Sequence, residues 1–382
     1  SGPAAGTPTA DIIFLIALVL SRISQKKQLY VLWVDLRTAF PSLNRPILLR
    51  KMFYCGVGLG ICRMMLAILD ATTSIVCIGG LISRPFKDTL GVREGAVEAP
   101  HAFNIYVSDL RAYIESAHPR LCRLLGFAVA VILYADDAAF PADSAEDLQI
   151  AASLFEEFCN DNHLYISVPK TFVTVFHHAA DNGVTYSGEE VFVDDNKVEI
   201  HIYGQLIAAT STFKYLGVVF DSTCSSSAHT EARAAATERA AHLLYAGLSH
   251  IPAYPHKFLT YLWTSLVVPV QAYGMDVFPP SQTATQQAQV KERRWWRRLM
   301  QLGGRAPNTT TQVLMGLSSC DIGWRVSRVA LFLRCANAPV TSFSHLAFIV
   351  HHNLKTPWFR AALADVCLVV PSTSLIPTFC NN

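Results

Sequence analysis

The chain has 382 residues, of which 51% are hydrophobic and only 16% charged, so it can bury a large core in about two or three packed units. Its longest apolar run, residues 12–20, falls short of the roughly 20 residues that cross a bilayer, which excludes a membrane span there. The net charge of +2 would give only weak support for nucleic-acid binding if the charges were spread evenly. The positive charges are instead concentrated in one segment in the second half of the chain.

The sequence also lacks the features of a secreted or zinc-binding protein. No basic segment precedes the apolar run and no small-residue cleavage site follows it, so we expect an intracellular protein, nuclear or cytoplasmic, that is not secreted. The ten cysteines are scattered without a CxxC pair, which predicts reduced core residues rather than a zinc site.

The first half of the chain alternates helix and strand signals. Residues 9–24 predict a capped helix and residues 29–35 a buried strand. Asn44, Pro46 and Gly56 predict the cap, the first turn and the end of a second helix. Further along we expect a hairpin turning at Gly79-Gly80, a helix over 99–116, a strand over 125–134, a helix over 144–163 and short strands up to residue 220.

The second half is almost entirely helical. Small polar residues at 221–227 predict a linker, and residues 228–247, 256–273 and 285–302 predict long helices. The last helix carries the local positive charge, with one negative side chain, Glu292, within it, and of its two adjacent tryptophans we expect one to face inward and one to stay near solvent. The basic residues are Lys291, Arg293, Arg294, Arg297 and Arg298.

Acidic residues close two of the predicted strands. Asp35 ends the strand over 29–35, and Tyr134-Ala135-Asp136-Asp137 lies between two short apolar pieces, as at the tip of a hairpin. Adjacent acids are also ordinary turn residues. If the strands are neighbours in one sheet, however, three carboxylates converge, which is the oxygen environment that Mg²⁺ prefers. Two such ions about 4 Å apart suit phosphoryl transfer.

Five segments, in this order, resemble the motifs of reverse transcriptases. Phe213-Lys214-Tyr215-Leu216-Gly217, followed by a helical region with Tyr273-Gly274, resembles the non-LTR retrotransposon group in particular. The resemblance covers roughly residues 9–335. The five segments begin with Val34-Asp35-Leu36-Arg37-Thr38-Ala39-Phe40, continue with Gly91-Val92-Arg93-Glu94-Gly95 and Tyr134-Ala135-Asp136-Asp137, and end with residues 164–171 and with Phe213-Lys214-Tyr215-Leu216-Gly217-Val218.

The resemblance implies an α+β fold. It would be a right-hand polymerase palm, an antiparallel sheet backed by helices, followed by an all-helical thumb and a helical C-terminal extension. The implied boundaries are 1–28 for the end of the fingers, 29–221 for the palm, 228–303 for the thumb and 304–382 for the extension.

The resemblance also implies an RNA-directed DNA polymerase acting on an RNA template, a DNA primer and dNTPs with two Mg²⁺ ions, or alternatively Mn²⁺. Its metal ligands would be Asp35, the Leu36 carbonyl, Asp136 and Asp137. Lys170 would assist the departing pyrophosphate. Contacts to substrate are implied for Phe40, Gly91, Arg93, Gly95 and Tyr134. The primer grip would be Phe213, Lys214, Tyr215, Leu216 and Gly217, and the basic residues of 291–298 would contact the nucleic-acid backbone.

Three positions depart from the family's pattern. Glu94 stands where the family usually has Gln, Glu98-Ala99-Pro100 replaces Leu-Ser-Pro, and Pro41 replaces an acid. The basic residues of the upstream fingers are not in the sequence, although the three catalytic acids are. The alternative interpretation is therefore a catalytically weak or inactive relic that binds nucleic acid or protein as a scaffold.

Overall fold

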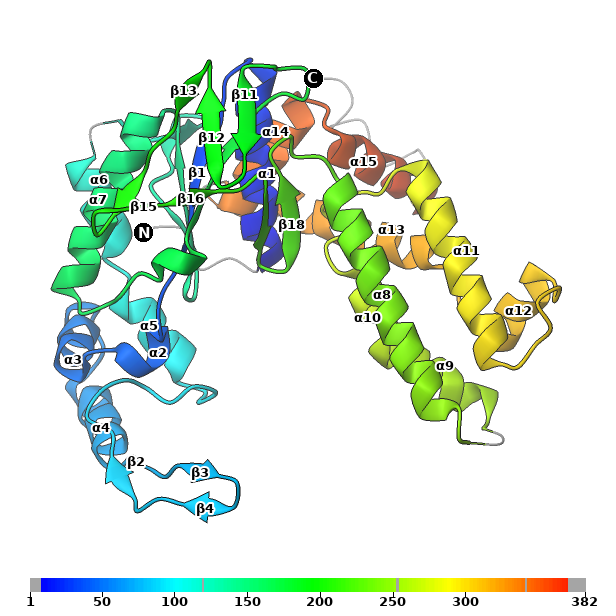
Figure 1. Ribbon diagram of the computed structural model, residues 1–382, viewed down its shortest axis with the longest axis horizontal. Helices are drawn as coiled ribbons and strands as arrows, with labels where there is room; N and C mark the ends of the chain where they lie inside the picture. Colours follow the sequence, from blue (N-terminus) through cyan, green and yellow to red (C-terminus); the bar gives the residue numbers. More distant parts are fainter. Residues whose placement is uncertain (1–7, 119, 252–253, 341, 370–382) are drawn as a thin grey trace. The chain divides into compact units, whose positions relative to one another are not determined.

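The computed structural model describes residues 8–118, 120–251, 254–340 and 342–369 (Figure 1). The chain divides into two compact units, Lys27–Ser211, here the sheet unit, and Ser1–Lys26 with Thr212–Asn382, here the helical unit. The strand pair within 212–221 therefore groups with the helices rather than with the sheet. The ends of the expected fingers segment and C-terminal extension, residues 1–7 and 370–382, lie outside the described residues.

The sheet unit is built on one five-stranded sheet with the order β16-β10-β1-β9-β8. All neighbours are antiparallel except β10 and β16. The strands are β1 (Leu29–Asp35), β8 (Ile132–Tyr134), β9 (Asp137–Ala142), β10 (Phe172–Phe176) and β16 (Ala208–Ala209). This confirms the expected α+β class and the antiparallel sheet backed by helices.

Short helices and strand pairs surround this sheet. The helices are α2 (Ala39–Ser42), α3 (Arg45–Tyr54), α4 (Leu59–Asp70), α5 (Ala99–Tyr106), α6 (Leu110–Ala117), α7 (Ala145–Asp161) and the short η1 (Val168–Lys170). The strand pairs are β2 (Thr73–Ser74) with β5 (Phe86–Lys87), β3 (Cys77–Ile78) with β4 (Leu81–Ile82), β6 (Arg123–Leu124) with β7 (Phe127–Ala128), and β14 (His201–Ile202) with β15 (Gln205–Leu206). A three-stranded sheet holds β11 (Val184–Ser187), β12 (Glu190–Val193) and β13 (Asn196–Lys197).

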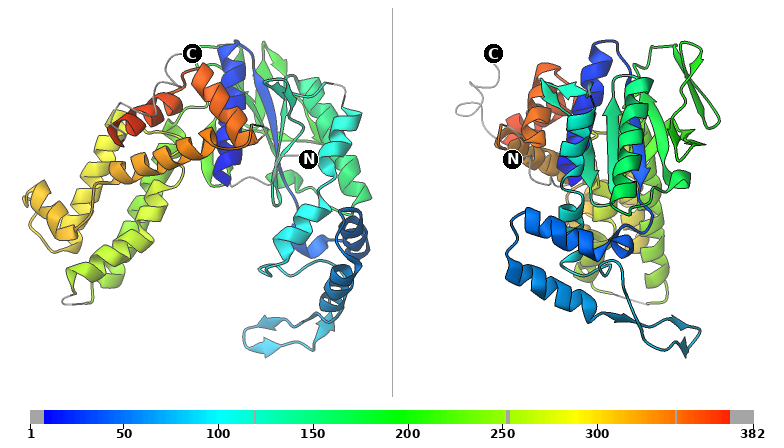
Figure 2. Two further views of the ribbon diagram at one scale, coloured as in Figure 1. Left: turned by 180° about the vertical axis from the view of Figure 1, so that it is seen from behind. Right: turned by 90° about the vertical axis from the view of Figure 1, so that its left-hand side faces the viewer.

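The core of the sheet unit lies between one face of the sheet and α7. The helix begins where the Ser144 hydroxyl accepts from the Asp147 amide at 3.1 Å, as its sequence predicted. Its apolar face then meets β9, with the Phe155 ring 4.8 Å from the Phe140 ring. The helices α3 and α4 pack on each other beyond the end of the sheet (Figure 2). The packing of α7 on β1 and β9 holds the two strands that carry Asp35 and Asp137.

Two predicted elements of the sheet unit are interrupted. The helix expected over 99–116 is divided at Val107 into α5 and α6. The division occurs there because the buried Lys51 ammonium donates a hydrogen bond to the Tyr106 carbonyl at 2.6 Å. The strand expected over 125–134 is reduced to β7 and β8. The helix α4 was not predicted.

The helical unit contains one hairpin, β17 (Thr212–Tyr215) with β18 (Val218–Asp221), followed by helices. The helices are α1 (Pro8–Ser24), α8 (Ser227–Leu248), α9 (His256–Leu266), α10 (Val268–Ala272), α11 (Gln282–Leu299), α12 (Asn308–Met315), α13 (Cys320–Ala336), α14 (Phe343–Asn353) and α15 (Pro357–Val369). The helix expected over 256–273 is divided at Val267, two residues before Pro269, which lies in the first turn of α10. Residues 221–227 form an ordered turn in which the Asp221 carboxylate accepts from Thr223 and Ser225.

Tryptophans dominate the interior of the helical unit. Trp263 and Trp296 are both fully buried, with ring centroids 6.1 Å apart, and Trp295 is only 6% exposed. The expectation that one of the two adjacent tryptophans stays near solvent was therefore wrong, because α8, α9 and α12 all pack on α11. Among the described residues, no helix is long and apolar enough to cross a membrane.

Candidate active site and nucleic-acid interface

The three predicted acids come from two adjacent strands of the sheet unit. Asp35 ends β1 and lies directly opposite Asp137, the first residue of β9. Asp136 belongs to the two-residue turn between β8 and β9, where Ala135 has a φ of 50°. A left-handed alanine costs roughly 1–2 kcal/mol, so the surrounding strands must hold this turn. The turn thereby keeps Asp136 beside the facing pair Asp35 and Asp137.

The three acids are close enough to affect one another's ionisation. The pKa of the Asp137 carboxyl is raised to about 6, first by burial and then by the negative charges of Asp136 and Asp35. The charged form is therefore disfavoured, and a bound cation would relieve it. The cluster is thus suited to binding a positive ion.

This shift has a consequence for stability. The folded protein holds the Asp137 proton more tightly than the unfolded chain, whose carboxyl has the ordinary value of 3.8, so the free energy of unfolding should fall as pH rises from about 4 to about 6. Asp137→Asn should therefore be more stable than the parent above that window, by on the order of 1 kcal/mol after solvent screening, and no more stable below it. Urea unfolding at a pH on each side measures both differences. Equal midpoints above the window would contradict this account.

A lysine-bearing segment lies beside the first acid. Leu36 and Ile166 form an isolated antiparallel β-bridge. Two hydrogen bonds make it: the Ser167 amide donates to the Asp35 carbonyl at 2.9 Å, and the Arg37 amide donates to the Tyr165 carbonyl at 2.8 Å. Neither bond uses the Leu36 carbonyl. Lys170 then follows in η1, with its Nζ 3.3 Å from Asp35 Oδ2. The structure thus brings Lys170, Asp35, Asp136 and Asp137 together.

The carboxylate oxygens of this cluster are the type of ligand that a hard divalent cation prefers, but they do not enclose such an ion. Among the described residues, no three His, Cys, Asp or Glu side chains are arranged to hold a metal ion by themselves. Mg²⁺ commonly takes one or two carboxylates and completes its shell with water and substrate phosphates. The carboxylates therefore fit an ion that arrives with a phosphate-bearing substrate.

The loop around Gly91 packs under Phe40. The Val92 amide donates to the Phe40 carbonyl at 2.9 Å, and the Phe40 ring lies 5.3 Å from the Phe103 ring. Gly91 has a φ of 74°, and a Cβ there would lie 2.3 Å from the Pro41 carbonyl oxygen. Arg93 and Gly95 are exposed, and Tyr134 is half-buried opposite Asp137. Phe40 and Gly91 are thus in one packed arrangement, whereas Arg93 and Gly95 face solvent.

Arg45 was missed by the sequence reading. This buried arginine donates to the carbonyls of Gly91 at 3.0 Å, Asp88 at 2.6 Å, Leu69 at 3.0 Å and Leu90 at 3.2 Å, so it holds both ends of the loop that leads to Gly91. The sequence offered only a weak indication of this role. A positive side chain in the first turn of a helix is disfavoured by the helix dipole, so its presence there suggests a specific interaction elsewhere.

The hairpin of β17 and β18 carries the predicted primer-grip residues. Its turn has left-handed residues at Leu216 and Gly217, as tight hairpins require. The Tyr273 hydroxyl donates to the Leu216 carbonyl at 2.5 Å. His229 is also involved, because its Nδ1 accepts from the Val219 amide, which leaves Nε2 to donate to the Tyr273 carbonyl at 3.0 Å. These contacts fix the turn to α8, while Phe213 is half-buried, Lys214 exposed and Tyr215 buried.

The five basic residues of α11 have different environments. Arg297 donates to the Ala306 carbonyl at 3.0 Å and to the Asn308 side chain, so it joins α11 to α12. The Arg298 guanidinium lies 4.0 Å from the centre of the Tyr245 ring. Lys291 and Arg294 are exposed and Arg293 is half-buried. The cluster is therefore partly structural, and Arg294 is its most accessible arginine without a stacking partner among the described residues.

Comparisons with known proteins agree with these observations. Residues 6–220 match the reverse transcriptase (RNA-dependent DNA polymerase) family. Two curated relatives from Popillia japonica, both named Retrovirus-related Pol polyprotein from type-1 retrotransposable element R2, are 27% and 23% identical over 218 and 211 residues. Those matches cover 56% and 54% of this chain but 34% and 29% of the relatives, so the chain spans about a third of their length.

Solved structures of telomerase are similar at low identity. Apo telomerase from Candida tropicalis matches with a TM-score of 0.42 and 10% identity, over 99% of this chain and 57% of that one. Telomerase from Candida albicans with a fragment of telomeric RNA matches with a TM-score of 0.40 and 9% identity, over 83% of this chain and 54% of that one.

Proposed function

This chain belongs to the reverse transcriptase (RNA-dependent DNA polymerase) family, and on that premise we propose that it extends a DNA primer on an RNA template as part of a non-LTR retroelement protein. The observation that carries the proposal is the pairing of Asp35 with Asp137 in register, with Asp136 in the adjoining turn, inside the matched segment. The scaffold alternative is not favoured, because all three acids are present and clustered.

In this proposal the acids hold the cations that the family's chemistry requires. Asp35 and Asp136 would hold both ions, with the Leu36 carbonyl, and Asp137 would support them less directly. When bound, two Mg²⁺ ions, or Mn²⁺, activate the primer 3′-hydroxyl and stabilise the leaving group. The 3′-oxygen then bonds to the α-phosphorus as the bond to pyrophosphate breaks. Lys170 would neutralise or protonate the pyrophosphate from its place beside Asp35.

The domain names follow from the same proposal. Residues 1–28 would end the fingers, 29–221 would be the palm, 228–303 the thumb and 304–382 the C-terminal extension.

Arg93 and Gly95 would contact template and nucleotide, and Tyr134 would lie beside the primer end. The turn held by Tyr273 would be the primer grip, which matches its rigid attachment to α8.

The test of the proposed function is primer extension by the chain in its full-length parent protein. We expect extension of a DNA primer on an RNA template with dNTPs and Mg²⁺, and little with NTPs. A protein that bound the duplex but failed to extend the primer under any of these conditions would instead support the scaffold alternative.

Phe40 would select deoxynucleotides by lying beneath the incoming sugar. Its ring is half-buried and supported by Phe103, so its position is defined. Phe40→Val shortens this side chain and should raise ribonucleotide incorporation relative to deoxynucleotide incorporation by about tenfold or more. Single-nucleotide extension with each substrate measures the ratio. Unchanged discrimination with normal extension would count against this role.

Arg294 should contribute to binding of an RNA–DNA duplex by electrostatics. Arg294→Glu should weaken binding and reduce the slope of log affinity against log salt by about 1. Arg305→Glu, an exposed site outside α11, is the control with the same charge change. Arg297→Glu should instead lower thermal stability, because Arg297 bonds to Ala306 and Asn308. A salt slope equal to that of the parent for Arg294→Glu would remove Arg294 from the interface.

A further inference from the structure

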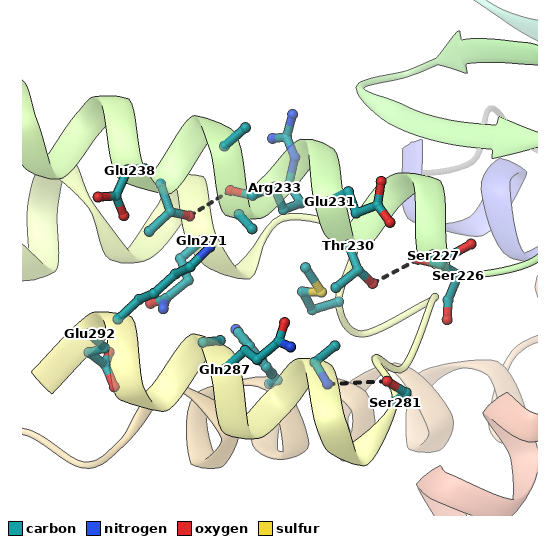
Figure 3. Close-up of a pocket in the computed structure, with 18 of the residues that line it drawn as sticks. Ser226, Ser227, Thr230, Glu231, Arg233, Glu238, Gln271, Ser281, Gln287 and Glu292 are labelled. Carbon is teal, nitrogen blue, oxygen red and sulfur yellow. Dashed lines mark hydrogen bonds between the residues drawn. The ribbon is translucent and has the colours of Figure 1, made fainter. Parts of the chain in front are cut away.

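A groove of about 640 Å³ opens between α8 and α11 in the helical unit (Figure 3). Its two walls carry alanines, Ala234 and Ala235 on α8 and Ala284 and Ala288 on α11. Because these side chains are small, the facing helices leave open space that larger residues would fill. The volume lies within the range of about 300–1,000 Å³ that is typical of small-molecule sites.

One buried polar side chain of the groove has no hydrogen-bond partner among the described residues. Gln271 is only 5% exposed, lines the groove, and its side-chain amide makes no hydrogen bond to any residue in the described ranges. A buried donor that is left unpaired costs about 1–3 kcal/mol. The Gln271 amide therefore suits a ligand that brings a hydrogen-bond acceptor.

The remaining lining residues define the ligand further. Trp295 and Trp324, which are 6% and 4% exposed, line the groove with aromatic atoms and so favour a planar ring. Glu231 and Glu238 also line the groove and disfavour a bare anion such as inorganic phosphate. The exposed Lys291 lies on the α11 side, where a phosphate attached to the ring can be neutralised. The ligand is therefore a planar, acceptor-bearing ring with a phosphate beside it.

We propose that this groove binds an unpaired nucleobase from a single-stranded part of the nucleic acid, with the ring against Trp295 and Trp324 and a carbonyl oxygen facing the Gln271 amide. Bases in single strands are recognised in this way, by aromatic contact together with hydrogen bonds to the base edge. The Gln271 amide offers a donor beside an acceptor, which complements the carbonyl and ring N–H of uracil. This binding is separate from the proposed synthesis in the sheet unit.

The test is titration of the full chain with uridine 5′-monophosphate in EDTA, followed by tryptophan fluorescence. We expect saturable binding that ribose 5-phosphate, which lacks the base, does not reproduce. Gln271→Leu should weaken binding about tenfold or more, whereas Gln286→Leu, an exposed site on α11 outside the groove, should not. Ala235→Leu, at an exposed wall position that tolerates a larger side chain, should also weaken binding by filling the groove.

Asp136→Asn should leave this binding unchanged, which separates the groove from the proposed catalytic acids. Equal affinity for ribose 5-phosphate, no saturable binding, or full affinity in both folded groove variants would overturn the proposal. A change of affinity in either direction in Asp136→Asn would also overturn it, because the nucleotide would then be in the sheet unit.

Discussion

Asp35→Asn and Asp136→Asn should each reduce primer extension by at least about a thousandfold while leaving the fold intact. Asparagine keeps the shape of the side chain but removes the charge that would hold the cations, and metal ions supply several kcal/mol of transition-state stabilisation. Asp35 ends a strand whose preceding residues are buried, so β1 itself should be unaffected. The measurement is the single-turnover rate of dNTP addition, beside thermal unfolding of each variant.

The control for this pair is Asp195→Asn. Asp195 is an exposed acid between β12 and β13 with a φ of 63°, a conformation that asparagine adopts readily. The Asp195→Asn variant should extend primers at the same rate as the parent protein. If either catalytic variant retained the parental rate with normal stability, the assignment of Asp35 and Asp136 as metal ligands would be wrong.

Local signals were sufficient to predict the strand that carries Asp35 and the caps of two helices. β1 has the predicted bounds because its run of buried apolar residues suits only an interior strand. α7 begins directly after the predicted cap Ser144, and α3 directly after Asn44, whose side chain accepts from the Ile47 amide at 3.1 Å. The convergence of Asp35 with Asp137 followed from placing two strands in one sheet, and the register confirms it.

The features that sequence reasoning missed depend on contacts between distant parts of the chain. Arg45 reaches the carbonyls of Asp88 and Gly91, and Lys51 reaches Tyr106, where it ends α5. His229 and Tyr273 meet across the helical unit in the same way. No periodicity or cap along the chain reports such a bond, because each partner has an ordinary local sequence. For the same reason the sequence did not distinguish Arg297, which bonds to residues of the next helix, from the exposed Arg294 in the same basic cluster of α11.

Gly91→Ala should be one of the most damaging single substitutions in the sheet unit, costing about 3 kcal/mol or more of unfolding free energy. The new Cβ would meet the Pro41 carbonyl oxygen at 2.3 Å, and Pro41 backbone atoms cannot move aside as a flexible side chain would. The φ of 74° adds a left-handed penalty of roughly 1–2 kcal/mol to this overlap. Since the neighbouring Val92 amide bonds to the Phe40 carbonyl, the displacement should also move Phe40.

Gly95→Ala provides the matched comparison. Gly95 has a similar φ of 78°, but a Cβ there would have no atom of the described residues within 4 Å. Its cost should therefore be only the left-handed penalty, roughly 1–2 kcal/mol. If Gly95 lets the backbone approach template and nucleotide, this variant should nevertheless raise the KM for dNTP while the protein remains folded. Urea unfolding and steady-state extension of both variants separate the two effects: equal stability losses would refute the packing role of Gly91, and an unchanged KM would refute the substrate role of Gly95.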